Sequence, residues 1–239
     1  MDLKFLYKAP ALLYKKTIIV GDTHFGMEYK LRRKGIFDNG FSVRLYEHLL
    51  SFIKEHKAER VIFLGDVKDE ITSMDSITDQ ILSKLSLQCE VMIVKGNHDG
   101  DIEKSLDKKI CVKPAEGMVF GNLGLMHGHS WPSEELLQCN YLVMGHQHPM
   151  VELTDAFGKV HRETVWVVAE PNPEAITKKY KKFNKKIKLI LMPAFNPLVG
   201  KSVNTSENKH LGPLLNNNLF KLESALFYRL DGTPIGNVI

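Results

Sequence analysis

The chain of 239 residues is long enough for one large α/β domain or two small ones, whose core needs no disulfide or metal for stability. The composition is that of an ordinary soluble protein, and the three cysteines form no Cys-x-x-Cys pair, which argues against a disulfide framework or a zinc knuckle. The first segment carries Asp2, Lys4 and Lys8, which argues against a secretory signal, and no apolar run approaches the roughly 20 residues that cross a bilayer. We therefore expect a cytoplasmic protein with no membrane partner.

The sequence contains five short apolar runs that predict buried strands, at residues 17–20, 61–64, 91–94, 123–126 and 141–144. Each run is followed directly by side chains that can bind metal ions. In chain order these motifs are Gly21-Asp22-Thr23-His24, Gly65-Asp66, Gly96-Asn97-His98-Asp99, His127-Gly128-His129 and Gly145-His146-Gln147-His148. The third motif crowds an amide, an imidazole and a carboxylate between two glycines, which lets the chain turn sharply at a strand end.

Two amphipathic helices are predicted between the first three strands. The helix over about 42–57 and the helix that follows it each carry one apolar face, at Leu45, Leu49, Phe52 and Ile53 and at Ile77, Ile81, Leu82 and Leu85. Strand, helix, strand, helix, strand is the order of a βαβαβ unit, in which the carboxyl ends of the strands meet at one edge. Ligand sites of open α/β sheets lie along that edge.

The later part of the chain predicts antiparallel structure. Alternating runs flank turns at 155–158 and 231–232, which indicates hairpins over 151–168 and 225–238. We expect these strands to form a second sheet packed on the first. Between the hairpins, Asn172 can cap a helix whose apolar stripe is Ile176, Tyr180 and Phe183. Residues 202–218 predict a long surface loop.

No repeat or linker divides the sequence convincingly. We therefore expect a single domain over 1–239, with the motif-bearing part at 16–150 and the antiparallel part with the basic helix at 151–239.

Seven side chains at the strand ends offer carboxylate, imidazole and amide donors: Asp22, His24, Asp66, Asn97, His127, His146 and His148. Such a set suits manganese, iron, zinc or magnesium, and it argues against a structural zinc site or copper(I). Seven ligands are too many for one ion, but with one shared carboxylate they suit two ions about 3.5–4 Å apart. A single histidine is usually a core or surface residue, yet six of the ten histidines lie in these motifs.

The excess positive charge is concentrated in one basic segment, whose seven lysines are Lys178, Lys179, Lys181, Lys182, Lys185, Lys186 and Lys188. Such a run is more often a solvated helix face than a ligand site. The other interpretation is that Lys178, Lys182 and Lys185 follow a nucleic-acid backbone, together with Arg32 and Arg33 in the loop after the first motif.

Taken in order, the motifs Gly-Asp-x-His, Gly-Asp-x-x-Asp, Gly-Asn-His-Asp, His-Gly-His and Gly-His-x-His resemble those of the calcineurin-like metallophosphoesterase superfamily. The resemblance covers residues 21–148. Gly26-Met27-Glu28 and residues 192–197 also resemble an archaeal phosphoesterase branch related to the nuclease subunit of the double-strand-break repair complex. The family implies an α/β fold, a four-layer αββα sandwich of two mixed sheets flanked by helices.

The resemblance also implies two divalent ions, with manganese the first choice and iron, zinc, nickel or magnesium as alternatives. One ion would be held by Asp22, His24, Asp66 and His148. The other would be held by Asp66, Asn97, His127 and His146, so that Asp66 bridges. A hydroxide held between the ions would attack phosphorus in line.

His98, which is not a ligand in the family, is expected to protonate the leaving oxygen or stabilise the transition state, with Asp99 or Asp69 orienting its ring. Asp69 stands where the repair nucleases have a histidine, so we do not expect two histidines to act together as the general acid here. We assign His127 as the ligand of its motif, because it directly follows the strand. His129 is left as a residue that supports the ligands or contacts substrate.

These observations favour a metal-dependent phosphoric ester hydrolase acting on a phosphate ester, as a phosphodiesterase with nucleic acid among its possible substrates. The alternative is a phosphatase or phosphodiesterase for a small nucleotide or other metabolite. A catalytically silent binding module is the third hypothesis, but such a module would be expected to lack ligands or the acid. The sequence does not determine the oligomeric state.

Overall fold

The computed structural model describes residues 3–202 and 212–236. The predicted loop over 202–218 lies mostly outside these residues, and its described end contains the short helix α5 (Pro213–Asn216). The end of the predicted C-terminal hairpin also lies outside the described residues.

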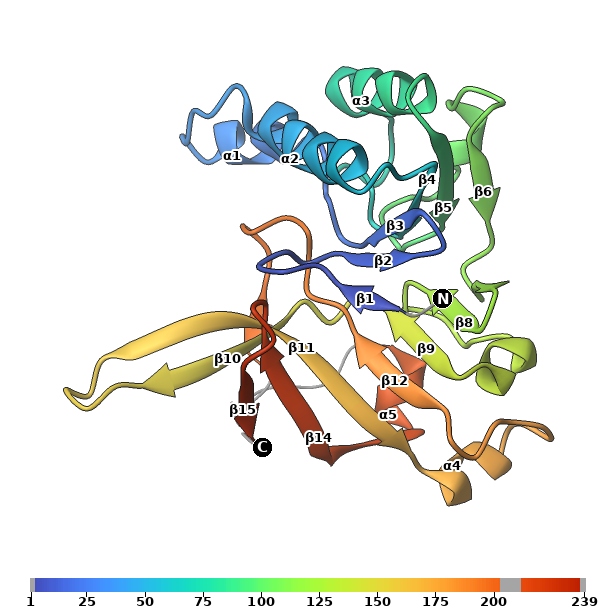
Figure 1. Ribbon diagram of the computed structural model, residues 1–239. Helices are drawn as coiled ribbons and strands as arrows, with labels where there is room; N and C mark the ends of the chain where they lie inside the picture. Colours follow the sequence, from blue (N-terminus) through green and yellow to red (C-terminus); the bar gives the residue numbers. More distant parts are fainter. Residues whose placement is uncertain (1–2, 203–211, 237–239) are drawn as a thin grey trace.

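The first sheet has six strands in the order of the chain: β1 (Lys4–Phe5), β2 (Leu12–Tyr14), β3 (Thr17–Val20), β4 (Arg60–Leu64), β5 (Glu90–Val94) and β6 (Cys111–Lys113). β3 to β6 are parallel, and β1 and β2 add antiparallel strands at one edge. The three predicted βαβαβ strands are therefore confirmed, and they lie side by side (Figure 1).

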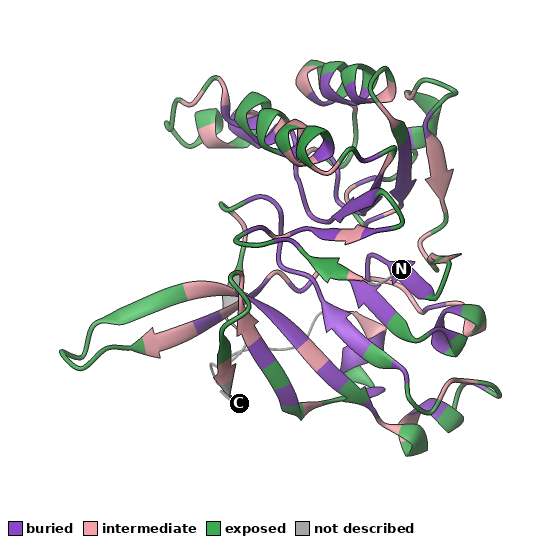
Figure 2. Cartoon of the chain, in the orientation of Figure 1, coloured by how far each residue is buried: buried purple, intermediate pink, exposed green. Residues whose placement is uncertain are grey.

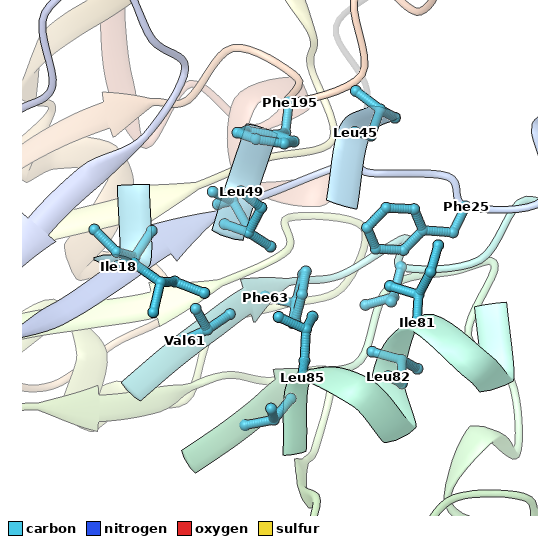
Figure 3. Packing of buried hydrophobic residues seen from close by; sticks show 14 of the residues in the cluster. Ile18, Phe25, Leu45, Leu49, Val61, Phe63, Ile81, Leu82, Leu85 and Phe195 are labelled. Carbon is cyan, nitrogen blue, oxygen red and sulfur yellow. The ribbon is translucent and has the colours of Figure 1, made fainter. Parts of the chain in front are cut away.

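Three helices cover the outer face of this sheet: α1 (Met27–Arg33), α2 (Phe41–Glu55) and α3 (Ser76–Ser86). The predicted apolar faces of α2 and α3 pack on the sheet, with Leu49, Leu82 and Leu85 fully buried (Figure 3). Asp75 caps α3 by accepting hydrogen bonds from the backbone N–H groups of Ile77 and Thr78. This apolar layer fixes the strands whose ends carry the ligand motifs.

The second sheet runs in the order β13-β10-β11-β12-β9-β8-β7, and β14 joins it through β11 and pairs with β15. Its strands are β7 (Met118–Phe120), β8 (Leu123–Met126), β9 (Tyr141–Met144), β10 (Pro149–Thr154), β11 (Val160–Pro171), β12 (Lys188–Leu191), β13 (Lys201–Ser202), β14 (Phe220–Arg229) and β15 (Pro234–Gly236). β8, β9 and β12 are parallel, whereas most of the other pairs are antiparallel. Two of the five motif-bearing strands, β8 and β9, thus belong to the second sheet.

The two sheets pack face to face around an apolar layer that includes Ile19, Ile62, Val143, Trp166 and Ile190. The outer face of the second sheet is covered by α4 (Pro173–Thr177), α5 and the 3-10 helix η2 (Glu134–Gln138). Another 3-10 helix, η1 (Ile102–Lys104), follows the third motif. The four-layer α/β sandwich is therefore confirmed, although its second helical layer is built only from short helices.

The predicted helix with the stripe to Phe183 is wrong beyond Thr177, where α4 ends. Asn172 does cap it, with Pro173 at its first position. Beyond Thr177 the chain makes hydrogen bonds to the segment that connects β8 to β9. Tyr180 Oη donates to the Pro132 carbonyl, and the backbone N–H of Asn184 donates to the Leu137 carbonyl. These tertiary hydrogen bonds replace helical ones in a run of like charges, which is unfavourable in a helix.

The β10–β11 hairpin is confirmed and projects from the body of the fold (Figure 1). Its turn is closed by Asp155, whose side chain accepts hydrogen bonds from the N–H groups of Phe157 and Lys159. The tip is exposed, in contrast to the buried strands of both sheets (Figure 2). Among the described residues, no helix combines the length and apolar character that spanning a membrane requires.

Candidate metal centre

The metal-ligand motifs from both sheets meet at one end of the sandwich, where β3, β4, β5, β8 and β9 finish. Five of the candidate ligands have left-handed backbone conformations, with positive φ angles: Asp22, His24, Asp66, His146 and His148. A residue other than glycine held there costs of order 1–3 kcal/mol, so the surrounding structure must enforce these conformations. Strained backbone of this kind concentrates at functional sites.

Two glycines of the motifs leave room for neighbouring site residues. A Cβ atom on Gly65 would lie 2.5 Å from the ring of His127, and one on Gly96 would lie 2.2 Å from Oδ1 of Asp66. Glycine is therefore needed at position 96 because the Asp66 carboxylate lies close to the backbone, and not because the backbone is left-handed there. Gly100, at the other side of the motif, does have a positive φ.

The first group of candidate ligands consists of Asp22, His24 and His148, whose donor atoms all lie within 4.8 Å of one another. Nε2 of His148 lies 3.0 Å from Oδ1 of Asp22. The carboxylate of Asp22 also accepts the backbone N–H of His146, which ties the loop after β9 to the loop after β3. One loop from each sheet thus contributes to this group.

The second group consists of Asp66, His127 and His146, and Asn97 joins it. Nε2 of His127 lies 3.1 Å from Oδ1 of Asn97, 3.1 Å from Nδ1 of His146 and 3.4 Å from Oδ2 of Asp66. The other ring nitrogen, Nδ1, donates to the Leu64 carbonyl at 2.8 Å. That bond orients the ring and leaves Nε2 as the nitrogen that can bind a metal.

Asp66 lies between the two groups. Its Oδ2 is 3.4 Å from Nε2 of His127 and 3.8 Å from Nε2 of His24, which belongs to the first group. Its Oδ1 accepts the backbone N–H of His98 at 2.8 Å, so the orientation of the carboxylate is fixed.

The candidate ligands suit a metal ion because several of their buried nitrogen atoms make no hydrogen bond to any described residue. Both ring nitrogens of His24 are shielded from water and make no hydrogen bond to any described residue. Nε2 of His148 makes none either, although Asp22 is near. Buried polar groups are nearly always satisfied, so ring nitrogens that make no hydrogen bond and lie close together suit the binding of a cation.

The electrostatics of the site keep its two aspartates ionised. Burial opposes ionisation of Asp22 and Asp66, but the neighbouring histidines keep the pKa of both carboxyls below the usual range. Burial also disfavours a charged His127, yet its hydrogen bond to Asp66 and the charges of both aspartates raise the pKa of His127 to about 9. Burial and the charge of His127 lower the pKa of His146 to about 4, so His146 is neutral, as a ligand must be.

The sequence matches the calcineurin-like phosphoesterase superfamily domain over residues 16–179. The chain belongs to this superfamily. Among solved structures, the nuclease MPE of Pseudomonas putida is similar over 96% of this chain and 94% of that chain, with 20% identity and a TM-score of 0.63. YfcE, a phosphoesterase from E. coli, is similar over 93% and 97% of the two chains, with 16% identity and a TM-score of 0.45. The comparison with curated proteins gave no significant match.

The superfamily match includes all five metal-ligand motifs that follow the predicted strands. The resemblance to calcineurin-like phosphoesterases is therefore confirmed, and with it the assignment as a metal-dependent phosphoester hydrolase. The narrower resemblance to the archaeal branch stays a prediction.

In this phosphoesterase, His98 is half-buried with its ring 4.9 Å from that of His24, centroid to centroid. Its Nδ1 lies 2.7 Å from the backbone carbonyl of Asp69, which accepts a hydrogen bond from it. The carboxylate of Asp69 instead faces His24, with Oδ1 3.5 Å from Nδ1. His24, Asp69 and His98 also form a third group of donor atoms within 4.8 Å of one another.

Asp99 does not orient His98, which corrects one of the two alternatives for that role. Its oxygens accept the backbone N–H groups of Val67 at 2.9 Å and Gly96 at 2.7 Å, and the residue is completely buried. Asp99 therefore holds the loops after β4 and β5 together. The ring of His98 is oriented by the main chain of Asp69 rather than by a carboxylate.

Two further residues hold the ligand loops and could not be predicted from the sequence. The ammonium of Lys68 donates to the backbone carbonyls of Glu70, Ile71 and His98, and only 3% of this residue is exposed. Asn196, which is fully buried, donates from its side chain to the Thr23 carbonyl at 3.1 Å. The segment 192–197, noted only by resemblance, thus supports the first ligand loop.

Helix α1 carries three cations, here called the rim cations: Lys30, Arg32 and Arg33. Lys30 and Arg33 lie beside the site, whereas Arg32 donates a hydrogen bond to Asn39. Lys30 Nζ lies 3.7 Å from Oδ1 of Asp69, and Arg33 pairs with Glu70 at 3.1 Å. The sequence predicts that Arg32 and Arg33 lie in a loop, but the structure shows that they form the last turn of α1. Lys30 could not be predicted, because in the sequence it resembles any exposed helical lysine.

His129 lies beside the second group, with its ring centroid 5.3 Å from that of His127. Burial and the charge of His127 lower the pKa of His129. The basic segment, in contrast, is not near the ligands. Its lysines are exposed and lead into the first residue of β12, which pairs with the first residue of β9, whereas the ligands follow the last residue of β9. Lys178, Lys182 and Lys185 therefore lie away from the metal centre.

Proposed function

We propose that the protein is a binuclear metal-dependent phosphoesterase that hydrolyses phosphodiesters. One observation carries the proposal: two groups of ligands face each other, and Oδ2 of Asp66 lies within 4 Å of a histidine from each group. A shared carboxylate between two sets of nitrogen and oxygen donors is the arrangement that two-metal hydrolases use.

In the proposed arrangement, one ion takes Asp22, His24, Asp66 and His148 as ligands. The other takes Asp66, Asn97, His127 and His146. Bound ions would supply a nucleophile at neutral pH and neutralise charge on the phosphoryl oxygens. The donors are imidazole, carboxylate and amide without thiolate, which favours manganese over softer metals, with iron, zinc, nickel and magnesium as alternatives.

His98 is proposed to act as the general acid. Because Nδ1 donates to the Asp69 carbonyl, Nε2 is the nitrogen that can hand a proton to the leaving oxygen. The main-chain contact fixes the ring without adding a negative charge beside it. His129 is proposed to support the second group or contact substrate.

The rim cations favour an anionic substrate that extends beyond the scissile phosphate, as a phosphodiester does. The similarity to a nuclease from Pseudomonas putida keeps nucleic acid among the candidate substrates, although at this level of identity it supports only a shared fold. The basic segment lies away from the metal centre, so its lysines cannot guide a nucleic-acid strand into the site. This position favours the second candidate function, hydrolysis of a small nucleotide or other metabolite. A silent binding module is the least favoured hypothesis, since the full ligand set and His98 are present.

A manganese-dependent activity panel tests the proposal. It compares bis-p-nitrophenyl phosphate, p-nitrophenyl phosphate and a single-stranded DNA oligonucleotide, each with manganese and with chelator. We expect metal-dependent turnover with the diester hydrolysed faster than the monoester. Faster monoester hydrolysis would favour the phosphatase alternative, and no turnover with any of the proposed metals would contradict catalysis.

A further inference from the structure

A cavity of about 690 Å³ lies between the two sheets, and none of the candidate metal ligands lines it. Its walls include Leu123, Tyr141 and Lys188, the first residues of β8, β9 and β12. The metal ligands, in contrast, follow the last residues of β8 and β9. The volume is that of a typical small-molecule site. The cavity is therefore separate from the phosphoesterase chemistry.

The cavity exists because the second sheet extends beyond the first. β1 and β2 have 2 and 3 residues, whereas β11 and β14 have 12 and 10 (Figure 1). The inner faces of β11 and β14 therefore extend beyond the area that β1 and β2 cover. Trp166 and Val168 of β11 and Tyr228 of β14 lie on this face and line the cavity.

The wall of the cavity is aromatic and carries an unused donor. Trp166 and Tyr228 are directly opposite each other on β11 and β14, so their side chains lie on the same face of the sheet, and both line the cavity. Phe5 of β1 packs edge-on against Trp166, with ring centroids 4.7 Å apart. The indole N–H of Trp166 is buried and makes no hydrogen bond to any described residue. Such a group recovers free energy when a ligand brings an acceptor.

The charges on the cavity have one sign. Lys188 and Arg229 are part of its lining, and no carboxylate lines the part of the cavity that the structure describes. Their acidic partners, Glu170 and Glu163, lie outside the lining. A bound molecule would therefore meet aromatic rings and two cations, each of which is paired with a carboxylate outside the lining.

We propose that this cavity binds a small planar aromatic anion. Its ring would pack on Trp166 and Tyr228 with Phe5 displaced or repacked, and an acceptor atom would take the indole N–H. Its negative charge would face Arg229 or Lys188. The site is independent of the metal centre, so the proposal does not rest on the proposed function.

The test uses the fact that the chain has two tryptophans, Trp131 and Trp166. In a ¹H–¹⁵N spectrum of the protein, the variant Trp131→Phe assigns the two indole signals. The probe is 2-naphthoate, and its neutral control is 2-naphthalenemethanol. We expect naphthoate to shift the Trp166 signal saturably while the Trp131 signal stays in place, with at least tenfold weaker binding of the alcohol.

Two kinds of variant locate the contacts. Trp166→Phe keeps an aromatic ring without the donor, and we expect it to weaken naphthoate binding about fivefold to tenfold. Arg229→Gln or Lys188→Gln should weaken it by a similar factor, whereas Lys84→Gln on the distant helix α3 should not. These affinities are read from naphthoate fluorescence, so they do not require the Trp166 signal.

Three outcomes would overturn the proposal. The first is a Trp166 signal that does not move at millimolar naphthoate in the unsubstituted protein. The second is equal affinity for the alcohol and the anion, which would indicate a merely apolar hollow. The third is a Trp166 signal that changes with protein concentration alone, which would show that a second copy of the chain covers this face.

Discussion

Lys68 offers the sharpest test of how the ligand loops are held. Its ammonium donates to three backbone carbonyls, those of Glu70, Ile71 and His98, and thus joins the loop after β4 to the loop after β5. Substitution Lys68→Met keeps most of the side-chain volume but removes all three donors. The matched control is Lys84→Met, an exposed lysine of α3.

The magnitude follows from the contacts. A hydrogen bond to a charged group contributes about 1.5–3 kcal/mol, so three bonds would give roughly 4.5–9 kcal/mol if their acceptors stayed dry. Glu70 and His98 are only half-buried and Ile71 is exposed, so water can partly replace the ammonium. We therefore expect a loss of about 3–4 kcal/mol in the free energy of unfolding, within the range for breaking a buried charged contact.

The assay is urea denaturation of both variants in the presence of chelator, so that metal binding does not contribute to the measured stability. The expected loss corresponds to a fall of roughly 6–16 °C in Tm for a chain of this size. Lys84→Met should change the free energy of unfolding by less than about 0.5 kcal/mol. A Lys68→Met variant within about 1 kcal/mol of the wild type would refute the idea that this lysine braces the site.

The remaining predictions concern the chemistry of the site. Asp66→Asn should lower metal content and turnover together, because one carboxylate serves both proposed ions; metal analysis of the purified variant measures this. His98→Ala should retain both ions yet lose a factor of roughly 10² to 10⁴ in turnover, with a smaller loss for a nitrophenol leaving group that needs no proton. Neutralising the three rim cations should flatten the logarithmic salt dependence of oligonucleotide binding by about one unit for each phosphate that these cations neutralise, whereas neutralising Lys178, Lys182 and Lys185 should leave it unchanged.

Each of these predictions has a result that contradicts it. Two ions per Asp66→Asn chain at wild-type affinity would remove the bridging assignment. Equal losses for good and poor leaving groups in His98→Ala would exclude an acid role. A reduced salt slope in the lysine variant alone would return the basic segment to the substrate path.

The strands, and the candidate ligands that meet at their ends, could be predicted because both depend on local pattern. An apolar run that stops at a glycine and a metal-binding side chain, as at Asp66 or His146, needs no knowledge of the rest of the fold. The predicted helix with the apolar stripe to Phe183 was wrong beyond Thr177, because the end of this helix depends on contacts distant in the sequence. Its end is set by hydrogen bonds from Tyr180 and Asn184 to a distant crossover, and helical periodicity contains no signal for them.

Roles that depend on direction could not be predicted either. Asp69 and Asp99 are both carboxylates near His98 in the sequence, and only the structure shows that one faces His24 while the other binds backbone N–H groups. Lys68 likewise looks like a solvated lysine until the carbonyls around it are seen. Sequence pattern indicates which chemistry is present, but contacts between loops decide what each group does.

The central claim is that two ions lie on either side of the Asp66 carboxylate. The most direct measurement is anomalous diffraction from crystals of the protein grown with manganese. The proposed arrangement predicts two anomalous peaks about 3.5–4 Å apart, one beside Asp22, His24 and His148 and the other beside Asn97, His127 and His146. A single peak held by His24, Asp69 and His98, with the second group empty at saturating manganese, would contradict it.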